Sequence, residues 1–192
     1  GLPTGDKGRI GLDIFRGDGN LICALVEADA RRPGQGRGAE RTPNDQQNGV
    51  YCSRNRGETW EQMSTTNNRP MYYSQIRIDP NDPERIYLGG SDLYRSSDGG
   101  RSFTNDAADG VHLDHHALWI DPNNSDHLLL GSDGGLSVSW DRSDNWYQFR
   151  NLPISQFYEI GIDSREPYHV CGGLQDNGSW CAPSDTWSGQ GI

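Results

Sequence analysis

Short apolar runs alternate with polar turns along the whole chain, and none has the length or the 3.6-residue period of an amphipathic helix. The runs typically last about four to eight residues and stop at Gly, Asn, Asp or Pro, which is typical of β-strands joined by tight turns. Asn48-Gly49 and Asn177-Gly178 suit two-residue hairpin turns, in which both central residues need positive φ. The pattern therefore predicts an all-β protein.

This pattern repeats with a nearly constant period. The aromatic residues that close successive polar turns are 43, 43 and 41 residues apart, at Trp60, Phe103, Trp146 and Trp187. The apolar runs that end in Asp are 66, 42 and 42 residues apart, at Asp13, Asp79, Asp121 and Asp163. The longer first step leaves about 24 additional residues, which we assign to a loop insertion at 29–49 because its composition is polar and rich in Gly and Pro.

Each repeat contains four short predicted strands, and four-stranded units with a period of roughly 40 to 50 residues indicate the blades of a β-propeller. We expect residues 1–192 to form part of a propeller with about four antiparallel blades, at about 8–66, 72–109, 114–151 and 156–192. Four blades are too few for a usual closed ring. We therefore expect the remaining blades of the same protein, or a second copy of the chain, to complete it.

The polar turns resemble the Asp box of BNR-repeat propellers, Ser-x-Asp-x-Gly-x-Thr-Trp. Residues 96–103, "SSDGGRSF", match best; residues 53–60 have Asn55 for the Asp, and residues 139–146 have Ser143 for the Gly. The Asp side chain of such a turn binds backbone N–H groups and the Gly takes positive φ, so the expected role of the motif is structural.

The chain as a whole resembles the sortilin-like (VPS10-like), "glycosyl hydrolase-like" BNR propellers of secreted proteins, and more distantly the xyloglucanase-type glycoside hydrolases. The stretches "YYSQIRIDPNDPERIYLGG", "DHHALWIDPNNSDHLLLGSDGGL" and "GGLQDNGSW" carry this resemblance. The resemblance implies a propeller that acts outside the cell, in recognition or in glycoside hydrolysis.

Polar and aromatic residues that do not repeat gather at the predicted starts of the innermost strands and at the turns between second and third strands. Both places open on one end of a propeller, which we call the channel face, and ligand sites form there in such folds. The predicted ligand-contacting residues are Tyr72, Tyr73, His115, His116, Phe157, Tyr158, Gln175 and Asn177. Aromatic rings at these positions either pack between blades or form a platform for sugars or peptide side chains. We expect a glycan or an extracellular protein as the partner.

The stretch "HLDHH" at 112–116 has the composition of a metal site. Adjacent residues of a strand point to opposite sides, so His115 and His116 do not easily share an ion, whereas Asp114 and His116 lie on one side. Asp114 and His116 are the candidate metal ligands. The alternatives for the histidines are hydrogen bonding within the fold and contact with a ligand, and we expect no metal or other cofactor.

Glycoside hydrolysis requires two carboxylates flanking the scissile bond. The candidate catalytic residues at the channel face are Asp6, Asp114, Asp133 and Asp176. The alternative is that all four bind backbone groups at strand starts and turns. A third possibility for the chain is a non-catalytic repeat module of a larger surface assembly.

The four cysteines occupy two matching places in the repeat. Cys23 and Cys171 align in the second strand, Cys52 and Cys181 align within a residue in the third, and these strands are neighbours. The repeat predicts one bridge in blade 1, Cys23–Cys52, and one in blade 4, Cys171–Cys181. Disulfides persist in oxidising compartments, so we expect a secreted, periplasmic or cell-surface protein.

The net charge of the chain limits the classes of partner that we expect. The chain has 17 Lys and Arg against 27 Asp and Glu, a formal net charge of −10. Nucleic acids and anionic membranes are bound by clustered Lys and Arg, so we expect neither as a partner. No apolar run reaches the roughly 18 residues that a membrane span requires, so we expect no span.

Overall fold

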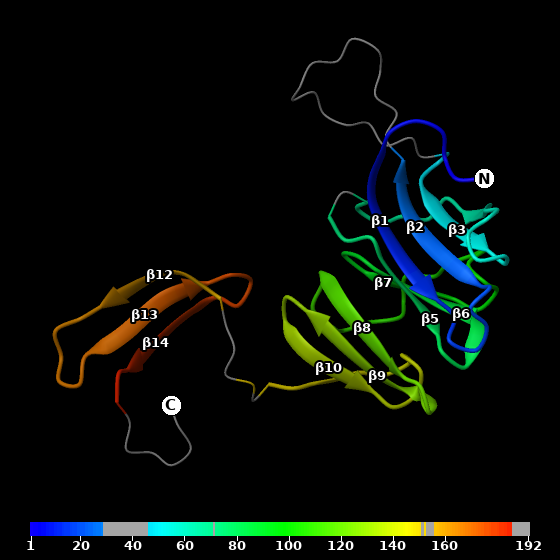
Figure 1. Ribbon diagram of the computed structural model, residues 1–192. Helices are drawn as coiled ribbons and strands as arrows, with labels where there is room; N and C mark the ends of the chain where they lie inside the picture. The colour runs from blue at the N-terminus through cyan, green and yellow to red at the C-terminus, as the bar shows by residue number, and fades with distance from the viewer. Residues whose placement is uncertain (29–45, 71, 151, 153–155, 186–192) are drawn as a thin grey trace, which may run out of the picture.

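The computed structural model describes residues 1–28, 46–70, 72–150, 152 and 156–185. Within these ranges the chain forms fourteen strands in four antiparallel sheets and contains no helix (Figure 1). The sheets follow one another along the chain, as propeller blades do, and confirm the predicted all-β partial propeller. Most of the predicted 29–49 insertion, and Trp187, lie outside the described residues. No helix in the described ranges has the length and apolar character to cross a membrane.

The strands of each blade are paired in chain order. Blade 1 contains β1 (Lys7–Ile14), β2 (Ile22–Ala28), β3 (Gly49–Ser53) and β4 (Glu61–Ser64), and blade 2 contains β5 (Gln75–Asp79), β6 (Asp82–Gly89) and β7 (Leu93–Ser96). Blade 3 contains β8 (His115–Asp121), β9 (Asn124–Ser132), β10 (Gly135–Ser139) and β11 (Tyr147–Gln148), and blade 4 contains β12 (Phe157–Ile162), β13 (His169–Leu174) and β14 (Ser179–Pro183). In blade 2 a bridge between Arg95 and Thr104 stands where the fourth strand was predicted.

The first strand of a blade packs against the preceding blade. Ile76 and Ile78 of β5 are buried in one cluster with Leu25 and Val50 of blade 1. One repeat later, Leu118 and Ile120 of β8 are buried against blade 2, beside Tyr87 and Leu93. Because side chains alternate along a strand, the same apolar pattern buries one face of each first strand in turn.

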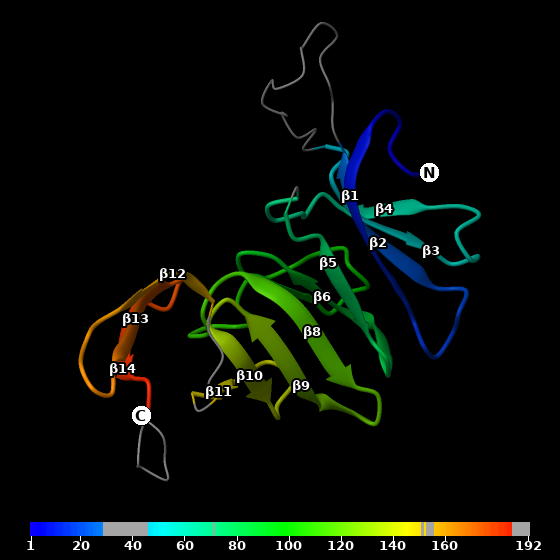
Figure 2. The same ribbon diagram turned by 60° about the vertical axis from the view of Figure 1, so that its left-hand side comes forward.

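Blade 4 does not bury the equivalent residues. Ile160 and Ile162 of β12 are 62% and 72% exposed. Figure 1 shows most of the sheet β12–β14 set apart from the other blades, and in Figure 2 one end of it lies beside blade 3. Ile10 and Leu12 of β1, the corresponding pair in blade 1, are also exposed.

In blades 1 and 2, the repeated Asp at the end of the first strand links its blade to the next one. Asp13 Oδ2 accepts a hydrogen bond from the Ile78 backbone N–H of blade 2 at 2.7 Å. The buried Asp79 accepts one from the Ser125 hydroxyl of blade 3, also at 2.7 Å. The repeated Asp therefore has a structural function between blades 1 and 2 and between blades 2 and 3.

Three polar turns close the outer end of blades 1, 2 and 3 with one hydrogen-bond pattern, and we call them the Ser-x-Asp turns (53–60, 96–103 and 139–146). In the second, the Ser96 hydroxyl donates to Asp98 at 2.7 Å and accepts from the Gly100 N–H at 2.9 Å. Asp98 also accepts the Arg101 and Ser102 N–H groups, both at 3.0 Å.

The two substituted turns keep this geometry. Asn55 accepts the Ser53 hydroxyl and the Thr59 N–H at 2.9 Å each, so an amide oxygen replaces the carboxylate. Ser143 stands at the glycine position with φ of 76°, close to the 87° of Gly100. The turn therefore imposes positive φ even on a residue with a Cβ.

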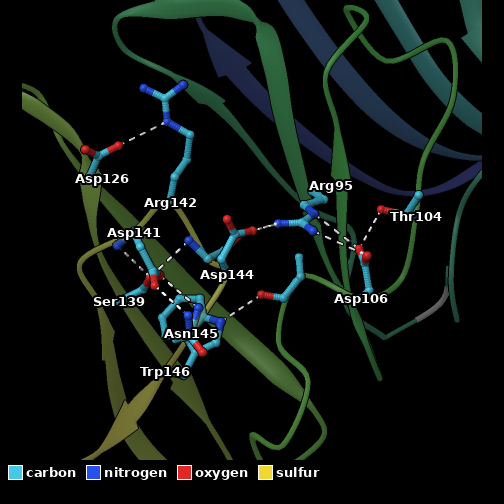
Figure 3. Close-up of polar contacts among 12 residues, drawn as sticks. Arg95, Thr104, Asp106, Asp126, Ser139, Asp141, Arg142, Asp144, Asn145 and Trp146 are labelled. Atoms are coloured by element: carbon cyan, nitrogen blue, oxygen red, sulfur yellow. Dashed lines mark hydrogen bonds and ion pairs between the residues drawn. The ribbon is translucent and has the colours of Figure 1, made fainter.

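Polar contacts join the third turn to blade 2 (Figure 3). Arg95 of β7 binds Asp106 of its own blade at 3.2 Å and Asp144 of the blade 3 turn at 2.6 Å. The Trp146 indole N–H donates to the Ala107 carbonyl at 2.7 Å. The aromatic residue that revealed the repeat thus holds two blades together.

Both predicted disulfides, Cys23–Cys52 and Cys171–Cys181, are present, and each joins directly opposed residues of neighbouring strands. The prediction that Cys23 and Cys171 occupy equivalent positions of the second strand is wrong by two residues, as their partners in the first strand show. Cys23 lies opposite Asp13, whereas Cys171 lies opposite Gly161, the counterpart of Gly11. Residues 15–21 lengthen the first turn of blade 1, and counting along the sequence does not reveal the shift in register.

His115 is a core residue between blades 2 and 3 rather than a surface residue. It is 2% exposed and lines a small cavity with Tyr87 and Leu93 of blade 2. Burial lowers the pKa of its imidazole to about 4, although nearby Asp92 and Asp114 act in the opposite direction. Tyr73, one repeat earlier, is equally buried.

We predict that Gly11→Ala disrupts the packing of blade 2 on blade 1. A Cβ at Gly11 would lie 2.0 Å from the Ser74 carbonyl oxygen, a backbone atom that cannot move aside alone. The expected loss in the free energy of unfolding is about 1–3 kcal/mol, by analogy with overpacked cores. The matched control is Gly161→Ala, where the nearest atom is 4.0 Å from the added Cβ. Equal urea midpoints for the two variants would contradict the prediction.

We predict an acid-sensitive contribution from Asp98. Burial acts to raise its pKa, but hydrogen bonds from Ser102, Ser96 and Arg101 outweigh it and lower the pKa from 3.8 to about 2. A carboxyl with a lowered pKa stabilises the fold above its ordinary pKa, and the contribution is lost as the pH falls through about 2.

The test compares Asp98→Ala with Asp98→Asn. Loss of the turn bonds should cost on the order of 1–2 kcal/mol in the alanine variant at neutral pH. The asparagine variant should lose less stability, because Asn55 makes the equivalent hydrogen bonds in blade 1. Since asparagine does not titrate, this turn should no longer contribute to the loss of stability between pH 3.8 and about 2 in that variant. Thermal unfolding across that range measures both effects; identical acid profiles for Asp98→Asn and the unmodified chain would refute the assignment.

We predict a second, separate pH window from His115. Its folded pKa lies below the ordinary 6.5, so the unfolded chain takes up the proton first as the pH falls. The contribution is present above about pH 6.5 and is lost as the pH falls to about 4, with a limiting size on the order of 3 kcal/mol. His115→Phe, the residue that blade 4 has at Phe157, should flatten the unfolding profile in this window. A profile that keeps its slope would assign the pH dependence to another group.

Candidate functional site

The structure brings together side chains from blades 2 and 3 at the channel face, which we call the channel-face cluster. The contributing segments are the one before β5, the start of β8 and the β9–β10 turn. The members are Arg69, Tyr72, Tyr73, Asp114, His116 and Asp133. Sequence analysis had singled out every member except Arg69 as a site residue.

Three rings form the centre of this cluster. The Tyr72 and Tyr73 rings meet edge to face with centroids 4.9 Å apart, and His116 lies 5.0 Å from Tyr73 and 6.0 Å from Tyr72. The Arg69 guanidinium lies 5.4 Å from the Tyr72 ring centroid and 5.6 Å from that of Tyr73, within cation–π range. Tyr72 is 51% exposed, so one ring of the cluster is presented to solvent.

Polar contacts hold the rings in place. Arg69 lies 3.6 Å from Asp114, and its Nη1 donates to the Tyr73 hydroxyl at 3.4 Å. Burial and the hydrogen bond with Asp114 raise the pKa of Tyr73 well above 10, so its hydroxyl stays protonated at neutral pH. Tyr73 therefore supports Asp114 from the interior, while Tyr72 and Arg69 face solvent.

Backbone strain accompanies this arrangement. Arg69, Ser74 and Asp114 all have positive φ, of 56°, 48° and 66°. Such conformations cost energy in residues with a Cβ and tend to concentrate at functional sites.

Asp133 connects the cluster to a cavity of about 580 Å³ between blades 3 and 4, the blade 3–4 cavity. Its carboxylate lies 3.1 Å from His116 Nε2, and it also lines the cavity. The polar lining residues are Ser132, Asp133, Gln148, Arg150, Gln156, Gln175, Asp176 and Asn177. Phe149 and Trp180 add aromatic surface, and Trp180 is 63% exposed.

A hydrogen bond between two residues that line this cavity joins blades 3 and 4. The Asn177 side-chain amide of the β13–β14 turn donates to the Asp133 carbonyl at 3.2 Å and to its own neighbour Gln175 at 2.9 Å. The predicted ligand residues Gln175 and Asn177 thus share one cavity with the catalytic candidates Asp133 and Asp176.

The remaining predicted residues lie elsewhere. Asp6 is exposed in the segment before β1 of blade 1. Phe157 and Tyr158 begin β12 and are 42% and 69% exposed. His115 is buried beneath the channel face, where it contacts neighbouring side chains rather than solvent.

The candidate metal ligands bind different partners. Asp114 is paired with Arg69 and His116 with Asp133. In the described ranges, no group of three or more His, Cys, Asp or Glu side chains is arranged to hold a metal ion.

Sequence reasoning missed several residues that line the cavity: Gln148, Phe149, Arg150 and Trp180. They lie on the outer strands or just after them, away from the strand starts where a channel site was expected. Gln156 had a signal, since it occupies the same strand-start position in blade 4 as Asp114 in blade 3.

No protein-family model matches the chain, and no curated protein matches it either. Solved structures do resemble it. The GH74 enzyme of Niastella koreensis is 14% identical with a TM-score of 0.54, over 91% of this chain and 28% of that one. The GH74 xyloglucanase of Xanthomonas campestris is 16% identical with a TM-score of 0.50, over 90% of this chain and 28% of that one.

A solved structure that is not named as a GH74 enzyme also resembles the chain. YCF48 from Cyanidioschyzon merolae is 16% identical with a TM-score of 0.52, over 95% of this chain and 55% of that one. The chain thus spans between about a quarter and just over half of the length of these three structures. At these identities the likeness establishes the fold alone: the chain is part of a β-propeller of the kind found in GH74 enzymes and YCF48.

Proposed function

We propose that this propeller recognises a carbohydrate at its channel face, in the blade 3–4 cavity and over the adjoining channel-face cluster. The observation that carries the proposal is the cavity itself: about 580 Å³, which falls within the roughly 300–1,000 Å³ of small-ligand sites. That volume suits a few sugar rings better than the broad surface of a folded protein.

The chemistry of the lining supports a sugar. Side-chain amides of Gln148, Gln175 and Asn177 both donate and accept hydrogen bonds, as vicinal hydroxyl groups require. The exposed indole of Trp180 provides a flat apolar surface for the C–H face of a pyranose. Tyr72, exposed beside His116, extends the aromatic surface toward the channel.

The site of action in this proposal is outside the cytoplasm. The two disulfides are compatible with an oxidising compartment, and this supports a secreted, periplasmic or cell-surface protein. The BNR and sortilin-like resemblance of the repeated turns points the same way.

Glycoside hydrolysis is the second candidate, because Asp133 and Asp176 line the same cavity. Most glycosidases use two carboxylates that flank the scissile bond. His116 lies 3.1 Å from Asp133 and Asp176 is exposed, so the two carboxylates have different environments.

We predict that the chain binds oligosaccharides and that Trp180→Ala weakens binding about five- to tenfold, since loss of an aromatic stacking surface costs roughly 1–1.5 kcal/mol. Glycan-array screening followed by calorimetry with the best ligand measures the effect. The control is Tyr168→Ala, which removes an exposed aromatic residue from the turn between β12 and β13, at the opposite end of blade 4.

The outcomes separate the candidate functions. Release of reducing sugar that Asp133→Asn and Asp176→Asn abolish, with binding retained, would establish the hydrolase. Binding without turnover supports the recognition module. Equal binding by Trp180→Ala and Tyr168→Ala would exclude the blade 3–4 cavity. No glycan binding, with stable capture of an extracellular protein or of further blades, would replace the proposal with an assembly role.

A further inference from the structure

We propose that Asn177 is a site of spontaneous deamidation, which places a carboxylate on the wall of the blade 3–4 cavity. The chemistry stands on the local structure alone; only its consequence for ligand binding rests on the proposed carbohydrate site.

The reaction needs a mobile Asn followed by a residue without a side chain. The backbone nitrogen of Gly178 loses its proton and attacks the side-chain carbonyl carbon of Asn177, and the C–N bond to the side-chain nitrogen breaks, releasing ammonia. The resulting succinimide is opened by water at either of its two carbonyl carbons. The products are aspartate or isoaspartate, and no oxidant, reductant or enzyme is consumed.

The turn at 175–178 satisfies these requirements. Asn177 is exposed, and Gly178 has positive φ of 73°. A Cβ placed on Gly178 would meet no heavy atom within 4 Å, so the space beside its Cα is open. The two hydrogen bonds of the Asn177 amide, to the Asp133 and Gln175 carbonyls, must open before the ring closes. Both involve an exposed hairpin end, where local opening requires little free energy.

The other Asn-Gly pair of the sequence is an internal control. Asn48 is 4% exposed, and its Oδ1 accepts the Ala28 N–H at 2.8 Å. Gly49 begins β3 and pairs with Val26, and a Cβ there would lie 2.0 Å from the Ser64 carbonyl oxygen. The same dipeptide is therefore buried and paired in blade 1 and exposed to solvent in blade 4.

Deamidation would change the cavity in two ways. The Asn177 amide donates to the Asp133 and Gln175 carbonyls, and a carboxylate cannot donate to either. The hydrogen bond across the cavity is lost, and a new negative charge joins Asp133 and Asp176 on its walls. Isoaspartate also lengthens the backbone of the hairpin. We expect weaker binding of an uncharged glycan in the aged protein.

The experiment incubates the folded chain at mildly alkaline pH and maps peptides by mass spectrometry over time, with isoaspartate methyltransferase as an independent label. The peptide that contains Asn177 should convert at least tenfold faster than the one that contains Asn48. In urea the two peptides should convert at similar rates, because the protection of Asn48 is structural. Comparable rates in the folded chain, or no conversion at Asn177, would overturn the proposal.

Variants separate this inference from the proposed function. Gly178→Ala should slow conversion at Asn177, and Asn177→Asp should reproduce the binding behaviour of the aged protein. Asn177→Gln keeps the amide and should be stable on incubation, which makes it the matched control. If conversion occurs as described but fresh protein binds no glycan, the modification site stands and the carbohydrate proposal fails.

Discussion

The packing of the first strands of blades 2 and 3 against the preceding blade is the interaction on which the rest of the structure depends. Ile76 and Ile78, and then Leu118 and Ile120, are buried in this way, and each set aligns the strand starts at the channel face. The channel-face cluster exists because β5 and β8 are held side by side, with Tyr73 and His115 buried beneath them. Hydrophobic burial between blades thus positions a polar site that no single blade contains.

The opposite end of the blades is stabilised by local hydrogen bonds. The Ser-x-Asp turns satisfy their own backbone N–H groups, and the third turn also contributes Asp144 to an ion pair with Arg95 of blade 2. Because these turns stabilise the opposite end of the blades, residues at the channel face can vary in sequence. Arg69, Tyr72 and Asp133 therefore differ from their counterparts in the other blades without disturbing the repeat.

The sequence predicted what the period determines: the blades, the polar turns and both disulfide pairs. The two-residue offset between the bridges escaped it, because the first turn of blade 1 is longer and the pairing register, not the residue count, sets which positions face each other. The buried state of His115 depends on a neighbouring blade. Trp180 and Gln148 line one cavity from two different blades, so no local pattern marks them as members of the same site.

The links from Asp13 to Ile78 and from Asp79 to Ser125 run in one direction, from each blade to its successor. A chain built this way behaves as a nearest-neighbour array, in which each unit adds an intrinsic term and one interface term. Duplicating or deleting a whole unit alters only the interfaces that adjoin it. Such a design permits propellers of different ring size to arise from one repeat by recombination, with the specific site redrawn only on the loops.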